Sequence, residues 1–239
     1  MNGGRSAWIL FDADNTLWDV ESLYDRARHA FCAHVEDLLR RTGRDPGIDG
    51  ALVEMLQRRR DIQLHETHGY SPSRFARSFE DTLLFLLPHS SPDEVRQARR
   101  LASDVFATVA EPTPGLETTL PALEVDYSLA IVTAGDKVVQ ESRLAAFRHR
   151  DRFERIEVVE QKSEAVLEKL CQVWGVDKRR SWFVGDSLRS DIIPATRIGL
   201  NAIHFHAPNW AVEHGRRPER VPVAVTMAEV MALIGAAMR

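Results

Sequence analysis

The second half of the chain alternates short apolar segments with helical ones, and this alternation limits the possible folds more than any other feature. Apolar segments of strand length occupy residues 127–134, 155–160, 181–186 and 201–207. Helical patterns lie between them, at residues 137–147, 164–174 and 191–198. Strands that alternate with helices form a parallel sheet with right-handed crossovers. The apolar residues 7–11 add a further strand, so we expect an α/β fold with a Rossmann-like parallel sheet core.

A helical region separates this first strand from the others. Apolar residues recur at three- and four-residue steps through residues 20–110, which predicts four helices with short connections. We therefore expect two domains. Residues 1–17 and 113–239 form the α/β catalytic core, and residues 18–112 form an inserted α-helical bundle. The segment EPTPG at 111–115 is the expected return hinge.

Polar residues follow the strands, at the end where open parallel sheets bind their ligands. The first strand runs into Asp12 and Asp14, which point to the same side if the strand geometry persists. Carboxylates are rarely buried without a partner, and their oxygens suit a hard cation such as Mg²⁺. The sequence therefore predicts a cation site at this edge of the sheet. The other polar candidates at strand ends are Thr133, Lys162, Asp186 and Asp191.

These residues lie in four segments that resemble a known family. DADNT at 12–16, the threonine of VTAG at 132–135, Lys162 and GDSLRSD at 185–191 match, in order, the four motifs of the haloacid dehalogenase superfamily. Four motifs in order are far more specific than D-x-D-x-T alone. The resemblance covers the whole chain, and the insertion resembles the helical cap domain of these enzymes. It implies a Mg²⁺-dependent phosphatase that hydrolyses a small phosphorylated metabolite, a phosphomonoester, through an aspartyl-phosphate intermediate.

The resemblance also implies catalytic and substrate-binding roles. Asp12 is the expected nucleophile. Asp14 is the expected general acid, which then becomes the base that activates water. Thr133 is expected to hold a phosphoryl oxygen together with the backbone N–H of Ala134. Lys162 is expected to neutralise the phosphate and to orient the nucleophile.

The resemblance implies a metal site as well. Asp12 and Asp186 are the expected carboxylate ligands of Mg²⁺, and Asp14 is expected to contribute its backbone carbonyl. Asp191 is expected to support the metal, either directly or through a water molecule.

Three positions differ from the family's common pattern. Asn15 stands where glycine is most frequent, although asparagine tolerates unusual backbone angles. Ala134 stands where asparagine is common, which removes a polar group near the substrate. Ser163 follows Lys162 where proline is common. Each catalytic group that the resemblance implies is present.

Other functions share parts of this pattern. A 2-haloacid dehalogenase also uses an aspartate nucleophile, but that class lacks an acid at the position of Asp14 and does not need Mg²⁺. A phosphotransferase would pass the phosphoryl group to an acceptor other than water. A regulatory binding protein would keep the fold without turnover.

Bulk properties bear on the protein's surroundings. A net charge of −4 suggests no general affinity for nucleic acid. The sequence contains no apolar stretch near the roughly 20 residues that span a bilayer, and residues 1–14 lack the pattern of a cleavable signal. Cys32 and Cys171 lie far apart in helical patterns, as reduced core residues do. We therefore expect a cytoplasmic protein that binds neither nucleic acid nor membrane.

Overall fold

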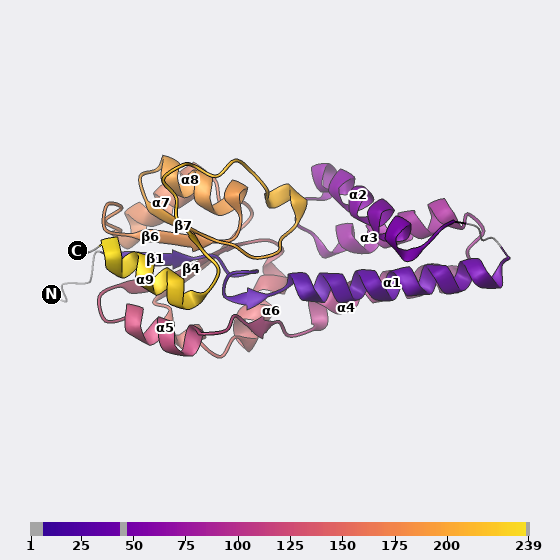
Figure 1. Cartoon of the computed structure of the whole chain (residues 1–239), viewed down its shortest axis with the longest axis horizontal. Helices are drawn as coiled ribbons and strands as arrows, with labels where there is room; N and C mark the ends of the chain where they lie inside the picture. The colour runs from indigo at the N-terminus through magenta and orange to yellow at the C-terminus, as the bar shows by residue number, and fades with distance from the viewer. Residues whose placement is uncertain (1–6, 44–46, 238–239) are drawn as a thin grey trace. The chain divides into compact units, whose positions relative to one another are not determined.

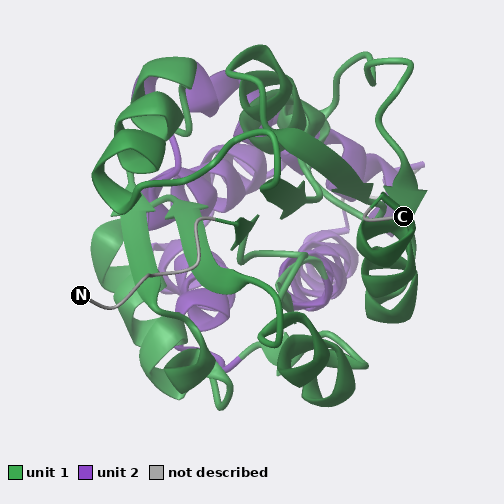
Figure 2. Cartoon of the chain, turned by 90° about the vertical axis from the view of Figure 1, so that its left-hand side faces the viewer, with its two compact units in different colours: residues 1–21, 110–239 green, residues 22–109 purple. Residues whose placement is uncertain are grey.

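The structure, a computed structural model, describes residues 7–43 and 47–237. The N-terminal residues 1–6, which are part of the segment expected to lack a signal, lie outside this description. The chain divides into two compact units (Figure 2). The sheet unit comprises Met1–Glu21 and Ala110–Arg239, and the helical unit comprises Ser22–Val109.

The sheet unit confirms the predicted α/β class. Its described residues form a six-stranded sheet in which every pair of neighbouring strands is parallel. In spatial order the strands are β5 (Arg155–Val159), β4 (Ser128–Ala134), β1 (Trp8–Phe11), β6 (Trp182–Gly185), β7 (Asn201–Phe205) and β8 (Val223–Ala224). The sequence did not predict β8, because two residues are too few to show an alternating pattern.

Helices cover both faces of this sheet (Figure 1). On one face, Trp8 and Leu10 of β1 pack in a cluster with Leu167 of α7 and Ala195 of α8. This cluster includes Cys171, which is a buried free thiol, as is Cys32. The helices of the sheet unit are α5 (Leu116–Leu123), α6 (Lys137–Ala146), α7 (Glu164–Trp174), α8 (Ile193–Arg197) and α9 (Met227–Ala237). Shorter helical turns are Arg150–Arg152, Leu188–Ile192 and Ala211–Glu213.

The helical unit contains the predicted bundle. Its helices are α1 (Glu21–Arg41), α2 (Gly50–His68), α3 (Pro72–Leu86) and α4 (Pro92–Ala107). Aromatic side chains join three of them, because Phe79 of α3 packs against Phe31 of α1 and Phe75 of α3 against Phe106 of α4. Ser91 begins α4 with a complete capping box to Glu94.

Both connections between the units pass through a two-stranded antiparallel ribbon in the sheet unit. It consists of β2 (Trp18–Asp19) and β3 (Glu111–Pro112). The N–H of Thr113 also donates to the carbonyl of Leu17 at 2.9 Å, and its hydroxyl to the carbonyl of Thr16 at 2.8 Å. The expected return hinge, residues 111–115, therefore begins with a paired strand. A strand of two residues is too short to show an alternating pattern in the sequence.

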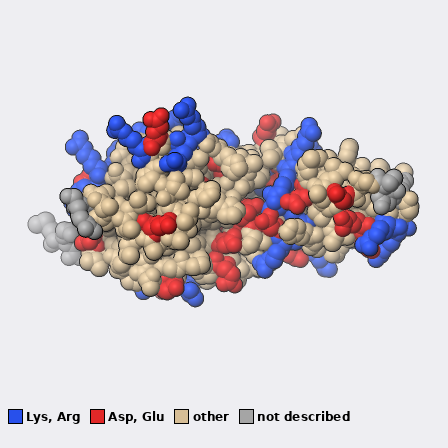
Figure 3. Space-filling view, in the orientation of Figure 1, with Lys and Arg blue, Asp and Glu red and all other residues tan. Residues whose placement is uncertain are grey.

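Acidic and basic side chains are interspersed on the visible face in Figure 3, in keeping with the small net charge. Within the described part of the chain, the helices are too short or too polar to cross a lipid bilayer.

Candidate active site

The predicted site residues emerge at one edge of the sheet. β1 lies between β4 and β6, and its last residue pairs with Ile131 of β4 and Val184 of β6. The chain runs from β1 outward through β4 and β5, then returns to the other side of β1 at β6, which is a topological switch point. The carboxyl ends of these strands therefore carry Asp12, Thr133 and Asp186 side by side.

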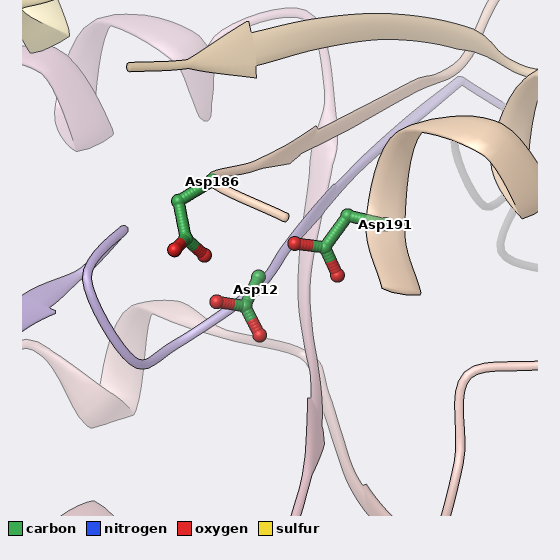
Figure 4. Close-up of side chains that lie close together, drawn as sticks. All are labelled: Asp12, Asp186 and Asp191. Atoms are coloured by element: carbon green, nitrogen blue, oxygen red, sulfur yellow. The ribbon is translucent and has the colours of Figure 1, made fainter. Parts of the chain in front are cut away.

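Three buried carboxylates converge at this edge. Asp12, Asp186 and Asp191 each offer an oxygen, and these oxygens lie within 4.8 Å of one another. Figure 4 shows the three carboxylate groups directed toward one another. Lys162 is also buried, and its ammonium donates to Oδ1 of Asp12 and lies 2.5 Å from Oδ1 of Asp191. Among the described residues, this cluster thus contains three carboxylates and one ammonium group.

The charges in this cluster are out of balance. Burial is the largest influence on Asp191 and raises the pKa of its carboxyl to about 7, although Lys162 opposes the shift. Burial also raises the pKa of Asp186 well above its usual value, and the charges of Asp12 and Asp191 raise it further. Burial alone would lower the pKa of Lys162, but the two carboxylates beside it raise that pKa instead. The lysine is therefore held charged, and the excess negative charge favours a bound cation.

The donor set fits a divalent metal. Carboxylate oxygens are hard ligands, and Mg²⁺ commonly takes a few of them together with water and substrate phosphate. The group of Asp12, Asp186 and Asp191 could hold such an ion. The contribution of the Asp14 carbonyl stays a prediction.

A close approach of backbone to side chain places Asp191. This residue lies in the π-helical turn Leu188–Ile192, and its Oδ2 accepts a 3.0 Å hydrogen bond from the N–H of Ser187. A Cβ at position 185 would lie 2.3 Å from that same Oδ2, so only glycine fits there. The sequence GDS at 185–187 therefore does more than supply Asp186, because Gly185 makes room for Asp191.

Two residues that the sequence analysis missed hold Asp186. The amide of Asn209 donates to Oδ2 of Asp186 at 3.0 Å and to its carbonyl at 3.1 Å. Nε2 of His204 lies 3.0 Å from the same carbonyl, which can only accept, so Nε2 carries the proton. Burial lowers the pKa of His204, which favours this neutral form. Asn209 lies in a loop without periodicity, so no sequence pattern pointed to it.

Thr133 is buried at the end of β4, with 1% of its surface exposed. Its hydroxyl has no hydrogen-bond partner among the described residues. Buried polar atoms are nearly always paired, so an unpaired one at a strand end suggests a missing ligand atom. Ala134, the other predicted substrate contact, is the last residue of β4 and is partly exposed.

Asp14 accepts hydrogen bonds from a different set of residues than the acidic cluster does. Its Oδ1 accepts from the indole N–H of Trp18 at 2.6 Å. Its Oδ2 accepts from the amide of Gln140 at 2.9 Å and from the guanidinium of Arg143 at 2.8 Å. The sequence analysis missed Gln140 and Arg143. Both polar side chains are buried on α6, where a helix normally presents apolar residues, and this burial is known only from the structure.

Asn15 adopts the left-handed conformation that its position in the turn requires, with φ of 60°. Its side chain accepts hydrogen bonds from the N–H groups of Val20 at 3.1 Å and Glu21 at 2.9 Å. Asparagine therefore replaces the common glycine at a position that tolerates it, and it also caps the start of α1.

The unbalanced charges lead to a prediction about pH and metal binding. In the metal-free protein the pKa of Asp191, raised to about 7, means that this carboxyl binds more protons in the folded than in the unfolded state between about pH 4 and about pH 7, and the raised pKa of Asp186 acts in the same direction. The free energy of unfolding should therefore fall as pH rises through that range. Mg²⁺ competes with these protons, so we expect its stabilisation to grow with pH up to about pH 7 and then to level off.

This expectation can be measured by thermal unfolding with and without Mg²⁺ from about pH 5.5 to about pH 8.5. As the pH falls below 7, the stabilisation by Mg²⁺ should weaken by up to about 1.4 kcal/mol per pH unit for each competing proton. Asp191→Asn should flatten this dependence, whereas Asp151→Asn, at an exposed site, should preserve it. An identical Mg²⁺ effect at every pH would contradict the argument.

Comparison with known proteins agrees with this geometry. The description "Haloacid dehalogenase-like hydrolase" belongs to the family profile that matches residues 63–205. Glyceraldehyde 3-phosphate phosphatase of Pyrococcus abyssi is 28% identical over 204 residues, which cover 82% of this chain and 80% of that protein. Pyrimidine 5′-nucleotidase YjjG of Escherichia coli is 27% identical over 222 residues, covering 86% of this chain and 92% of that protein.

A solved structure extends the agreement to the fold. The crystal structure of a haloacid dehalogenase-like family hydrolase from Xanthomonas campestris has a TM-score of 0.75 with 22% identity, covering 99% of this chain and 93% of that one. The family profile spans more than half of the sequence, and the six-stranded parallel sheet with its helical insertion matches that fold. The chain therefore belongs to the haloacid dehalogenase-like hydrolases.

Proposed function

We propose that this hydrolase is a Mg²⁺-dependent phosphatase that cleaves a small phosphomonoester through an aspartyl-phosphate on Asp12. The observation that carries the proposal is a second carboxylate, Asp14, two residues after a buried Asp12 in the same turn. A 2-haloacid dehalogenase does not need an acid at that position. The phosphatase and nucleotidase names of the relatives support the same choice.

In the first step a carboxylate oxygen of Asp12 attacks phosphorus and the bond from phosphorus to the ester oxygen breaks. Asp14 gives its proton to the leaving oxygen. The Thr133 hydroxyl and the Ala134 N–H donate to phosphoryl oxygens, which would give the buried hydroxyl its partner. Lys162, in contact with Asp12, orients the nucleophile and offsets the negative charge.

In the second step Asp14 takes a proton from water, the water oxygen attacks phosphorus, and the bond to Asp12 breaks to release phosphate. Asp12, Asp186, Asp191 and the Asp14 carbonyl are the proposed metal-binding groups. When bound, Mg²⁺ would supply the positive charge that lets an anionic carboxylate approach an anionic phosphate.

We expect EDTA to abolish phosphate release, Mg²⁺ to restore it, and Ca²⁺ to restore it poorly, because Ca²⁺ prefers more ligands and a looser geometry. Release of inorganic phosphate should be measured with triose phosphates, nucleoside monophosphates and other small phosphomonoesters. Halide release from 2-chloropropionate tests the dehalogenase alternative, and new phosphoesters formed with added alcohols test phosphotransfer. Full turnover in EDTA would contradict the metal assignment, and halide release without phosphate release would overturn the proposal.

A further inference from the structure

Three donors from two parts of the sheet unit surround the carboxylate of Asp14. We call Trp18, Gln140 and Arg143 the Asp14 clamp. Trp18 donates a hydrogen bond to Oδ1, while Gln140 and Arg143 both donate to Oδ2, with donor–acceptor distances of 2.6 to 2.9 Å. The Arg143 side chain is 5% exposed, and that of Asp14 is 28% exposed. A nearly buried guanidinium thus reaches a carboxylate that remains open to solvent.

One short helix supplies two of these donors. Gln140 and Arg143 are three residues apart, so they lie on the same face of α6. The helix starts directly after β4, with the side chain of Asp136 accepting from the N–H of Val139. The strand β4, which carries Thr133, is therefore followed within the first two turns of α6 by the residues that hold Asp14.

Gly135 lets the helix approach in this way. Its φ of 146° lies in the region that favours glycine. A Cβ there would lie 3.1 Å from Nε2 of Gln140, the same atom that donates to Asp14. The connection between β4 and α6 thus leaves room for the amide of Gln140.

Stability alone gives a weak reason for this arrangement. A buried ion pair contributes little compared with well-packed apolar residues of similar size, because both charges lose their water. Apolar residues at positions 140 and 143 would continue the buried stripe that Leu144 belongs to. The polar pair therefore needs a different explanation, and its shared partner is Asp14.

We propose that Gln140 and Arg143 are positioning residues that fix the orientation of Asp14 for both proton transfers, an inference that rests on the acid–base role of Asp14 in the proposed function. A general acid must stand within hydrogen-bond reach of the proton's destination, and a misplacement of about 1 Å costs roughly 100-fold in rate. A carboxylate offers about four lone-pair sites. Oδ2 accepts two hydrogen bonds and Oδ1 one from the described residues, so the clamp leaves Oδ1 as the oxygen that exchanges the proton.

The test replaces Arg143 with methionine, which keeps the apolar stem and removes the guanidinium. With an alkyl phosphomonoester and saturating Mg²⁺ we expect kcat to fall roughly 10- to 100-fold with KM changed less than about twofold. With p-nitrophenyl phosphate the first step needs little acid, so phosphoenzyme should accumulate on the variant.

Gln140→Met should lower kcat in the same way but less, and Arg143→Lys should recover part of the rate. Arg152→Met removes an arginine that pairs with Glu124 at 2.8 Å elsewhere on this unit and should leave kcat unchanged.

A double-mutant cycle separates positioning from a general loss of structure. If Arg143 acts through Asp14, adding Arg143→Met to Asp14→Asn should change kcat less than about twofold further. Full additivity, or an equal loss in the rate of the first step with both leaving groups, would overturn the inference while leaving the phosphatase intact. Should Arg143→Met fail to fold, the same cycle with Gln140→Met decides. A wild-type protein that neither releases phosphate nor forms phosphoenzyme would overturn the proposed function, and this inference with it.

Discussion

Asp12→Asn is expected to abolish turnover of every phosphomonoester, by roughly 10⁴-fold or more, because the asparagine amide cannot replace the carboxylate as nucleophile. The substitution keeps the size of a buried side chain, so the packing at the end of β1 should survive. Lys162 keeps Asp191 as an ion-pair partner. No aspartyl-phosphate should form, which intact-mass spectrometry after acid quench would show directly.

Loss of a metal ligand could produce a similar drop in rate. The activity of Asp12→Asn should therefore be measured at increasing Mg²⁺ until the thermal stabilisation saturates. Asp151→Asn, at an exposed position, is the matched control and should behave as wild type. A variant that still forms a phosphoenzyme at saturating Mg²⁺ would show that another residue is the nucleophile.

Asp14→Asn should lower turnover by about 10²–10⁴-fold, the usual contribution of general acid–base catalysis. The loss should depend on the leaving group. An alkoxide needs a proton in order to leave, whereas p-nitrophenolate leaves without much help, so the first step should survive better with p-nitrophenyl phosphate. The second step still lacks its base, and phosphoenzyme should therefore accumulate on this variant although it does not form on Asp12→Asn.

The comparison of the two leaving groups is the decisive measurement. Stopped-flow release of p-nitrophenolate should show a burst of about one equivalent per protein, followed by slow turnover. If Asp14→Asn hydrolyses alkyl phosphates at the wild-type rate, Asp14 is not the acid, and the argument against a dehalogenase or a non-catalytic role loses its main support.

The sequence predicted those features that depend on local patterns. Strands such as β4 and β6 are apolar runs that end in recognisable polar residues, and the parallel topology brings those ends together. The convergence of Asp12, Asp186 and Asp191 follows from this logic, and their oxygens do lie within 4.8 Å. Two-residue strands such as β2 and β3 are too short to carry a period, and α5 was missed because Pro121 interrupts its pattern.

The residues that form hydrogen bonds to Asp14 and Asp186 could not be predicted in the same way. Gln140 and Arg143 lie 126 and 129 residues from Asp14 in the sequence, and on helical periodicity alone they look like part of a solvated face. Asn209 reaches Asp186 from an irregular loop. Such contacts depend on the packing of segments distant in sequence, so they become visible only once the fold is known.

The β2–β3 ribbon also has a consequence for the order of folding. Asp19 and Glu111 are paired across it, so the two ends of the roughly 90-residue segment between them lie next to each other. Bringing the ends of an unfolded segment of that length together costs about 4 kcal/mol of chain entropy. β1 is the central strand and the first to be synthesised, yet its partners β4 and β6 follow this segment. The newly made chain must therefore carry four unpaired apolar residues, Trp8–Phe11, until the insertion and the later strands are complete, and in this interval the strand is most exposed to aggregation.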